Sequence, residues 1–341
     1  LACAASVMNT LAEMGSDMAI NEFISWYESP ENSIKRASLN AMARSGNPAA
    51  YPVLSKAARA VKYRWETTGA AGSFLTYARA AAGKGDRNSM MKVCRTLIRN
   101  CNDRDNIQFK TGALSTLVDN LGAGSMSYIL EALGSNDKSY RNAALMFINK
   151  VDDSRVTDDL MAFYNKAKPE ARPEIIRALG NRKDVRAAEL VESALSDIDS
   201  NVRVEAAEAL VKLVKEPDDA VKPLLGYLVK WQNIMDQAAA GSALKSVLSG
   251  RNTAMLIPAL ESSGNPGKRT IIDLLAWKSD PAYFGNVFDY VNSSDDQVKS
   301  ASIKALVNLS SWNDQQKLIG LLEQTVNPSH TGDLQTALGN A

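Results

Sequence analysis

The chain has 341 residues, a formal net charge of +1 and 45% hydrophobic residues, of which few are aromatic. A charge so close to zero points to no class of partner by long-range attraction. Three cysteines (Cys3, Cys94 and Cys101) are too few for a disulfide framework. We expect them to be buried small hydrophobic residues. The single histidine, His330, argues against Ser-His-Asp triads and histidine-based zinc sites.

A nine-residue pattern recurs about every 31 residues, as in VRVEAAEAL at 202–210 and VKSASIKAL at 298–306. Its first, fifth, eighth and ninth positions are apolar or small and form one stripe on a helix. A fixed period of this size indicates a repeat array. In chain order the frame fits residues 3–11, 34–42, a start near 66, then 107–115, 140–148, 171–179, 202–210, 236–244, 267–275, 298–306 and 330–338.

A second apolar segment lies between successive nonamers, for example at 224–229 and 318–322. Two helices of about 12 residues and two short turns fill a 31-residue period. Asn47-Pro48 and Asp280-Pro281 each place a capping side chain before a proline, which predicts a helix start. Signals for strands are missing from the sequence. The prediction is an all-α chain of about ten to eleven helix pairs.

The repeats resemble HEAT repeats, in the sub-type known as PBS-lyase HEAT-like repeats. The resemblance is carried by an Asp in the turn before the second helix, by Lys or Arg at the second nonamer position, and by Pro in the first helix. These residues are Asp137, Asp199 and Asp295; Lys35, Arg141, Arg172, Arg203, Lys268 and Lys299; and Pro52, Pro223 and Pro258. It implies a right-handed α-α superhelix, an α-solenoid, that covers residues 1–341 as one domain.

A basic residue at a helix N-terminus is unfavourable for the helix dipole. We therefore expect the recurring Lys or Arg to pair with a turn Asp of the same or the next repeat. The interval of 41 residues around 60–106 departs from the period and marks an irregular long repeat.

Both ends of the sequence fall inside a repeat, and neither has the polar character of a cap. The chain is therefore expected to be a fragment that is uncapped at both ends, from a larger bacterial multidomain protein. Leu1-Ala2-Cys3 also resembles, faintly, a lipoprotein cleavage site. The family resemblance slightly favours a periplasmic or cell-surface location over the cytoplasm. No run of 18 apolar residues exists to span a membrane.

The sequence predicts no catalytic residue, metal site or cofactor. Gly83-Lys84-Gly85-Asp86 is interpreted as a turn rather than a phosphate loop. HEAT-like metal hydroxylases would need several His-Glu pairs, and the phycobilin lyase role would need a tetrapyrrole site, for which there is no motif. A carboxylate pair in a cleft stays an open alternative. The tryptophans are expected to pack between repeats, with contact anchors in a groove as the alternative.

Residues 56–110 hold twelve basic and four acidic residues, a local balance of +8. Lys and Arg recur on one face of a helix at 87–100, and an aromatic residue interrupts the basic run at 62–65. One interpretation is a site for an acidic protein, a nucleic acid or an acidic glycan. The other is a solvated face, or one that pairs with a second copy. The candidate partner-binding residues are Lys62, Arg64, Trp65, Arg87, Lys92, Arg95 and Arg99.

The leading functional prediction is a non-enzymatic scaffold that presents a curved groove, lined by the nonamer helices, to a protein or peptide partner. One alternative is an accessory HEAT region of an exported carbohydrate-active enzyme. The other is anion or nucleic-acid binding through residues 56–110.

Overall fold

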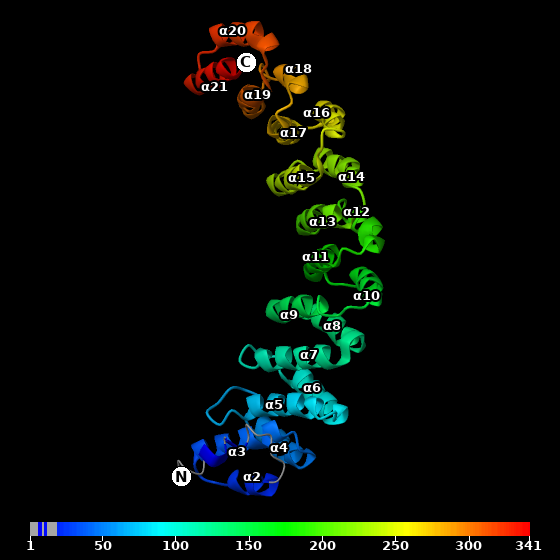
Figure 1. Ribbon diagram of the computed structural model, residues 1–341, viewed down its shortest axis with the longest axis vertical. Helices are drawn as coiled ribbons and strands as arrows, with labels where there is room; N and C mark the ends of the chain where they lie inside the picture. The colour runs from blue at the N-terminus through cyan, green and yellow to red at the C-terminus, as the bar shows by residue number, and fades with distance from the viewer. Residues whose placement is uncertain (1–5, 9, 12–18) are drawn as a thin grey trace. The chain divides into compact units, whose positions relative to one another are not determined.

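The computed structural model describes residues 6–8, 10–11 and 19–341. Within these residues it contains twenty α-helices, α2 to α21, seven short 3-10 helices and no strand (Figure 1). The prediction of an all-α solenoid is therefore confirmed. Cys3 and the start of the nonamer predicted at 3–11 lie outside the described residues.

The chain forms two compact units, Leu1–Phe163 and Tyr164–Ala341. In the first unit, consecutive helices pack as pairs, α2 with α3 and onward to α8 with α9. The helices are α2 (Ile20–Trp26), α3 (Asn32–Ser45), α4 (Tyr51–Ala60), α5 (Ala70–Gly83), α6 (Arg87–Asn100), α7 (Ile107–Leu121), α8 (Met126–Leu133), α9 (Lys138–Ile148) and α10 (Arg155–Tyr164).

The second unit begins with α11 and continues with five pairs, α12 with α13 through α20 with α21. Its helices are α11 (Arg172–Arg182), α12 (Ala188–Ala194), α13 (Ser200–Leu213), α14 (Pro217–Lys230), α15 (Ile234–Val247), α16 (Leu256–Ser262), α17 (Asn265–Lys278), α18 (Phe284–Phe288), α19 (Asp296–Leu309), α20 (Gln315–Gln324) and α21 (Pro328–Asn340). The prediction of a single array over 1–341 stays a prediction.

Within each unit the odd-numbered helices stack on one another. We call them the odd row and the even-numbered helices the even row. In the second unit, Figure 1 shows α11, α13 and α15 in a column to the left of α12, α14 and α16. All of the described nonamers lie on odd helices. One surface of the odd row is therefore covered by the even row, and the opposite surface is free to meet solvent.

The nonamer pattern is the burial pattern of the odd helices. In α13 its first, fifth, eighth and ninth positions, Val202, Ala206, Ala209 and Leu210, are all buried. Full burial of a Val or Leu side chain contributes about 1.5–3 kcal/mol, so this stripe drives the stacking. Small residues at the contacts bring neighbouring helices close together.

The irregular region of the first unit changes the predicted register. The buried stripe of α5 is Ala70, Phe74, Tyr77 and Ala78, so its frame begins at 70 and the predicted start near 66 is wrong. In α7 the frame begins at Phe109, two residues after the predicted start at 107. The cause is the long loop at 61–69. In this loop two consecutive residues, Lys62 and Tyr63, have positive φ angles (52° and 57°), which turn the chain before α5 begins.

The turn aspartates act as helix N-caps. Asp137 accepts a hydrogen bond from the Tyr140 backbone N–H at 2.8 Å, and Asp199 accepts one from Asn201 at 2.9 Å. Asp295 accepts from two backbone N–H groups of α19. An N-cap typically contributes about 1 kcal/mol to the stability of its helix. The Asp therefore recurs in these turns because it caps the helix that follows.

Candidate functional site

The recurring basic residue forms a buried ion pair at Arg203. Its side chain is 3% exposed and that of its partner Asp236, on α15, is fully buried. Arg203 Nε donates to Asp236 Oδ1 at 3.1 Å, and Nη1 donates to the carbonyl oxygens of Asp197 and Ile198 at 2.8 and 2.9 Å. The expected pairing with an acid of the next repeat is confirmed here, but the acid lies in the helix instead of the turn.

Aromatic residues close this cluster. The guanidinium carbon of Arg203 lies 3.6 Å from the centroid of the Trp231 ring, and the Tyr227 hydroxyl donates to Asp236 Oδ1 at 2.6 Å. Burial by itself raises the pKa of Asp236. The hydrogen bonds from Arg203, Tyr227 and Asn233 outweigh burial and leave the pKa below its usual value. The ionised carboxylate therefore fixes the first turn of α15 against α13.

A groove of about 400 Å³ lies next to this junction, between α15 and α17 of the odd row. Ile234, Gln237, Gly241, Lys245, Arg269 and Asp273 are among its lining residues. A Cβ added at Gly241 would lie 3.1 Å from the Thr270 methyl carbon, so the two helices approach closely at mid-groove. Gly241 has no Cβ and the side chains beside it are small, so they form the base of the groove. Longer side chains form its two sides.

Cations predominate in this groove. Lys245, Arg269 and Lys304 of α19 all act on the carboxyl group of Asp273. Burial raises the pKa of Asp273, and the three cations oppose that rise without cancelling it. Arg269 Nη1 also donates to the side-chain oxygen of Gln297 on α19. The groove therefore presents two positive charges, Lys245 and Arg269, and one acid on which Lys304 acts from α19.

The first unit has a cleft in the equivalent position, between α3 and α5. It measures about 790 Å³. Most of its lining residues have polar side chains, among them Asn32, Arg36, Asn40, Thr68, Ser73 and Thr76. In each unit a cleft therefore lies between two neighbouring odd helices.

None of the seven predicted partner-binding residues lines these clefts, although Trp65 lies two residues from Thr67, which lines the cleft of the first unit. Four of them, Arg87, Lys92, Arg95 and Arg99, lie on α6, which belongs to the even row. Lys62, Arg64 and Trp65 lie in the loop between α4 and α5.

Some of these side chains contact neighbouring segments. Lys92 Nζ lies 4.2 Å from the centroid of the Tyr51 ring, and Arg95 Nε donates to the Tyr128 hydroxyl at 2.8 Å. Arg64 Nη2 lies 3.4 Å from Asp103 Oδ2. The even row therefore uses part of the basic stretch to hold its own helices together.

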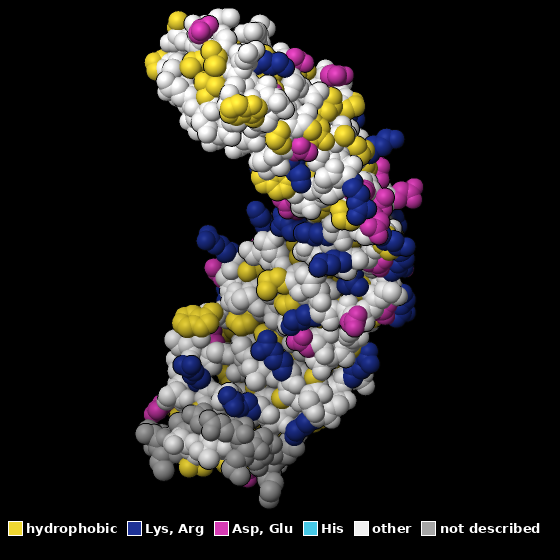
Figure 2. Space-filling model, turned by 45° about the horizontal axis from the view of Figure 1, so that its top comes forward, with side chains coloured by type: hydrophobic (Ala, Val, Ile, Leu, Met, Phe, Trp, Pro, Cys, Tyr) yellow, Lys and Arg dark blue, Asp and Glu magenta, His cyan; other side chains and the backbone are white. Residues whose placement is uncertain are grey.

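Much of the positive charge of residues 56–110 nevertheless remains at the surface. Eleven of the twelve basic side chains are exposed, with Lys110 the exception. Glu66 caps the start of α5 by accepting from the Ala70 N–H, and Asp86 caps α6 by accepting from Ser89. Figure 2 shows dark-blue side chains over the lower part of the view, where this unit lies, with few acids among them. Whether the patch binds a partner stays a prediction.

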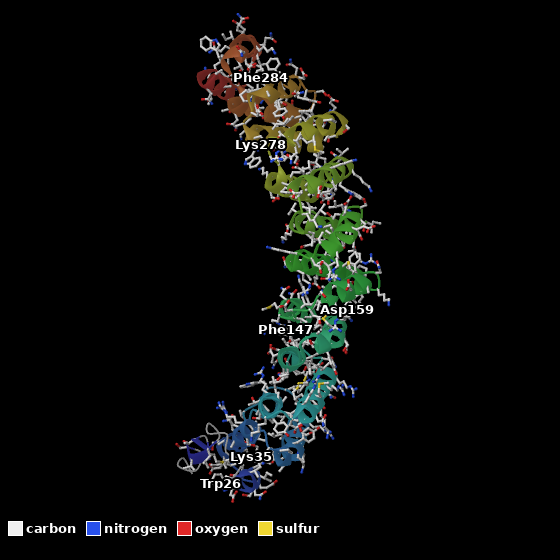
Figure 3. The ribbon with its side chains drawn as sticks, turned by 45° about the vertical axis from the view of Figure 1, so that its right-hand side comes forward. Trp26, Lys35, Phe147, Asp159, Lys278 and Phe284 are labelled. Carbon is white, nitrogen blue, oxygen red and sulfur yellow. The ribbon has the colours of Figure 1, made fainter. Side chains whose placement is uncertain are left out.

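One tryptophan has the predicted packing role, and the role of the others as contact anchors in a groove stays a prediction. Trp231 packs on Arg203, whereas Trp65 and Trp312 are 74% and 75% exposed. Lys278, labelled in Figure 3 on α17, has its Nζ 5.3 Å from the centroid of the half-exposed Trp277 ring.

Cys94 and Cys101 are buried and free, as expected. No described helix is long and apolar enough to cross a membrane. Among the described residues, no group of three or more His, Cys, Asp or Glu side chains could hold a metal ion.

Sequence reasoning missed the groove between α15 and α17. Two of its charged residues, Arg269 and Asp273, occupy the third and seventh positions of the nonamer 267–275, and Lys245 directly follows the nonamer 236–244. Those positions point away from the buried stripe. A comparison of the exposed positions between adjacent repeats would have provided the signal.

Comparison with known proteins agrees with this architecture. Residues 157–245 match the family model of HEAT repeats. This segment is therefore similar to HEAT repeats. The larger bacterial multidomain setting and the sub-type of the HEAT array stay predictions.

Solved structures show similar folds. Kap121p matches with a TM-score of 0.54 at 9% identity, over 93% of this chain and 41% of Kap121p. Importin beta matches with a TM-score of 0.45 at 13% identity, over 99% of this chain and 57% of the importin beta chain. Human deoxyhypusine hydroxylase matches with a TM-score of 0.32 at 16% identity, over 75% of this chain and 99% of the hydroxylase. Likeness at these identities shows the fold alone. No curated protein matches the chain in a sequence search.

Proposed function

We propose that this HEAT array is a non-enzymatic scaffold that holds a protein or peptide partner on the exposed surface of its odd row. One observation carries the proposal: the cleft of each unit lies between two neighbouring odd helices, α3 and α5 in one and α15 and α17 in the other. Repeat arrays create extended binding surfaces where stacked helices leave such spaces.

The lining chemistry supports binding. Hydroxyl and amide side chains such as Asn40, Ser73 and Thr76 offer hydrogen bonds to a polypeptide backbone, and the small residues leave it room. The second cleft adds Lys245 and Arg269, which supply charge for specificity.

Site-specific photo-cross-linking in cell extract tests this proposal. A benzophenone amino acid is placed on the odd row, at Thr76 or Ala238, and on the even row, at Ser127 or Lys222. We expect the odd-row positions to capture a partner protein and the even-row positions to capture little. Capture from the even row alone, or from neither row, would contradict the proposal.

A second function is supported by the exposed charge of residues 56–110. In this stretch eleven exposed cations outnumber four acids, and two of those acids cap helices. The carboxylates of the chain itself would therefore compete little with an anionic partner. The candidates are an acidic protein, a nucleic acid and an acidic glycan.

This second function is tested by replacing Arg87, Lys92, Arg95 and Arg99 together with Glu. A 20-base-pair DNA duplex and a heparin oligosaccharide are the probes. Wild-type affinity is expected to fall steeply as salt rises, because cations that contact phosphates or sulfates release counterions. The variant should lose most of that affinity. A control with Lys215, Lys222, Lys230 and Arg251 changed to Glu should keep it, and equal binding by all three proteins would contradict the idea.

The prediction that the array accompanies a carbohydrate-active domain stays a prediction. The coding sequence around the gene segment would test it directly.

A further inference from the structure

The groove between α15 and α17 has two chemically different ends. Both helices belong to the odd row and run in the same direction, so their first turns share one end. Ile234 and Pro266 lie there, and Ile234 is 88% exposed. Lys245 lies eleven residues further along α15, which places it about 16 Å from Ile234 along the helix axis. The first turns of both helices therefore form an apolar end, Arg269 follows three residues after Pro266, and Lys245 lies at the opposite end.

Beyond the apolar end the lining has an excess of positive charge. Its cations are Lys245 and Arg269, its one acid is Asp273, and Lys304 of α19 acts on the same carboxylate. All three cations are at least partly open to solvent. A carboxylate brought by a partner would meet two cations that Asp273 alone does not neutralise. Arg in particular binds carboxylates with two parallel hydrogen bonds.

A buried acceptor in the lining is left without a hydrogen bond. The Gln237 side chain is 6% exposed, and its Nε2 donates to the carbonyl oxygens of Leu228 and Trp231, both at 2.7 Å. These two bonds orient the amide, and its Oε1 has no partner. An unsatisfied buried acceptor costs about 1–3 kcal/mol, so a donor from a ligand would be favoured there. A peptide backbone has such N–H donors.

The floor is shaped for an extended chain. Ala238, Gly241 and Ser242 follow one another along the exposed side of α15, and Gly241 brings Thr270 close. A helix of about 10 Å diameter needs a wider trough than one between two such closely packed helices. An extended chain rises about 3.3 Å per residue, so 16 Å corresponds to about five residues.

We propose that the groove between α15 and α17 binds an extended acidic peptide segment of a partner protein. An apolar side chain of that segment sits against Ile234, and Asp or Glu side chains bind Arg269 along the groove and Lys245 about five residues from the apolar side chain. A net excess of one positive charge among the lining residues suits a short acidic segment better than a nucleic acid, which needs many phosphate contacts for affinity. This inference rests on the proposed scaffold function and gives it a partner class.

The probe is a library of random twelve-residue peptides displayed on phage, selected against the full chain. We expect the selected peptides to be enriched in Asp and Glu, with an apolar residue four to six positions from the acids. Synthetic copies should lose at least tenfold in affinity for the double variant Lys245→Glu with Arg269→Glu. The control Lys215→Glu with Lys222→Glu should bind like the wild type.

The apolar end has its own pair of variants. Ile234→Ser should weaken the selected peptides several-fold, and Ile234→Leu should leave the affinity close to that of the wild type. Circular dichroism checks that each variant keeps its helices. Selected peptides without enrichment in acids, or equal binding to the wild type and the double charge variant, would overturn the inference. Enrichment of basic peptides would do the same.

The two proposals fail in different ways. If cross-linking captures a partner from the odd row while the peptides ignore Lys245 and Arg269, the scaffold stands and the acidic-peptide site is wrong. If cross-linking captures nothing from the odd row, the scaffold function itself is wrong.

Discussion

At the scale of single residues, Arg203 shows why a cation recurs where the helix dipole disfavours it. The guanidinium satisfies two turn carbonyl oxygens, stacks on Trp231 and pairs with Asp236 of the next repeat. Arg141 repeats part of this arrangement, because its Nη1 donates to the carbonyl oxygen of Ser135 at 2.9 Å. One side chain therefore ties a turn, its own helix and the following repeat together.

Removal of Asp236 should be strongly destabilising. Asp236→Ala leaves Arg203 charged and buried without its counterion, which typically costs about 3–5 kcal/mol. The control is Asp296→Ala on the exposed first turn of α19, where a loss under about 1 kcal/mol is expected. Urea unfolding followed by circular dichroism measures both. Equal losses in the two variants would show that the buried pair contributes nothing special.

The same carboxylate predicts an acid-dependent loss of stability. The pKa of Asp236 is lower in the folded chain than its usual value, so the group favours folding above its unfolded pKa of about 3.9. That contribution disappears as the pH falls through the lower folded value. Between pH 5 and pH 3 the wild type should lose more unfolding free energy than Asp236→Asn. Parallel curves for the two proteins would contradict this.

The buried cysteines should be unreactive while the chain is folded. Burial raises the pKa of both the Cys94 and Cys101 thiols to about 12, so almost no thiolate exists at neutral pH. We expect iodoacetamide to label them at least a hundredfold faster in 6 M guanidinium than in buffer, as followed by peptide mass spectrometry. Rapid labelling of Cys94 in buffer would show that α6 opens readily.

At the scale of helices, the spacing of the odd row depends on the absence of side chains at the contacts. A Cβ at Gly180 of α11 would lie 2.6 Å from the Ala209 Cβ of α13 and 2.8 Å from its Cα. Both atoms belong to or adjoin the backbone, so no side-chain rotation relieves the overlap. The helices themselves would have to separate.

Two glycine substitutions test this contact against helix propensity. Gly180→Ala should destabilise by about 1–3 kcal/mol through overpacking, although Ala favours helix formation. Gly226→Ala in the middle of α14 meets nothing within 4 Å and should stabilise by up to about 1 kcal/mol. Denaturant midpoints distinguish the two signs. A stabilising Gly180→Ala would mean that α11 and α13 yield easily.

The elements were more predictable than the site. The odd helices could be predicted because buried residues such as Val202, Ala206 and Leu210 recur at a fixed spacing. Asp199 likewise indicated where a helix starts. The loop that displaces α5 could not be placed, since positive φ at Lys62 and Tyr63 leaves no mark in the residue types. The groove also escaped prediction, because Lys245 and Asp273 come from different helices and no periodic pattern links them.

At the scale of the whole molecule, each helix contacts mainly its neighbours in sequence and in the adjacent repeat. Stability in such arrays is approximately a sum of local terms. The unit Tyr164–Ala341 therefore has most of its interactions within itself. We expect a protein of these residues alone to be helical and to unfold cooperatively in urea, as measured by circular dichroism. An unfolded product would show that this unit depends on residues before 164.

The division of each nonamer between buried and exposed positions affects how such a chain can diversify. Positions 1, 5, 8 and 9 are constrained by packing, whereas positions 3 and 7, occupied by Arg269 and Asp273 in α17, face outward. Mutations at the outward positions change recognition with little effect on folding. Duplication of a repeat followed by changes at these two sites would therefore give a new binding pocket on an unchanged frame. An engineer could use the same route to transfer the groove between α15 and α17 to another pair of odd helices.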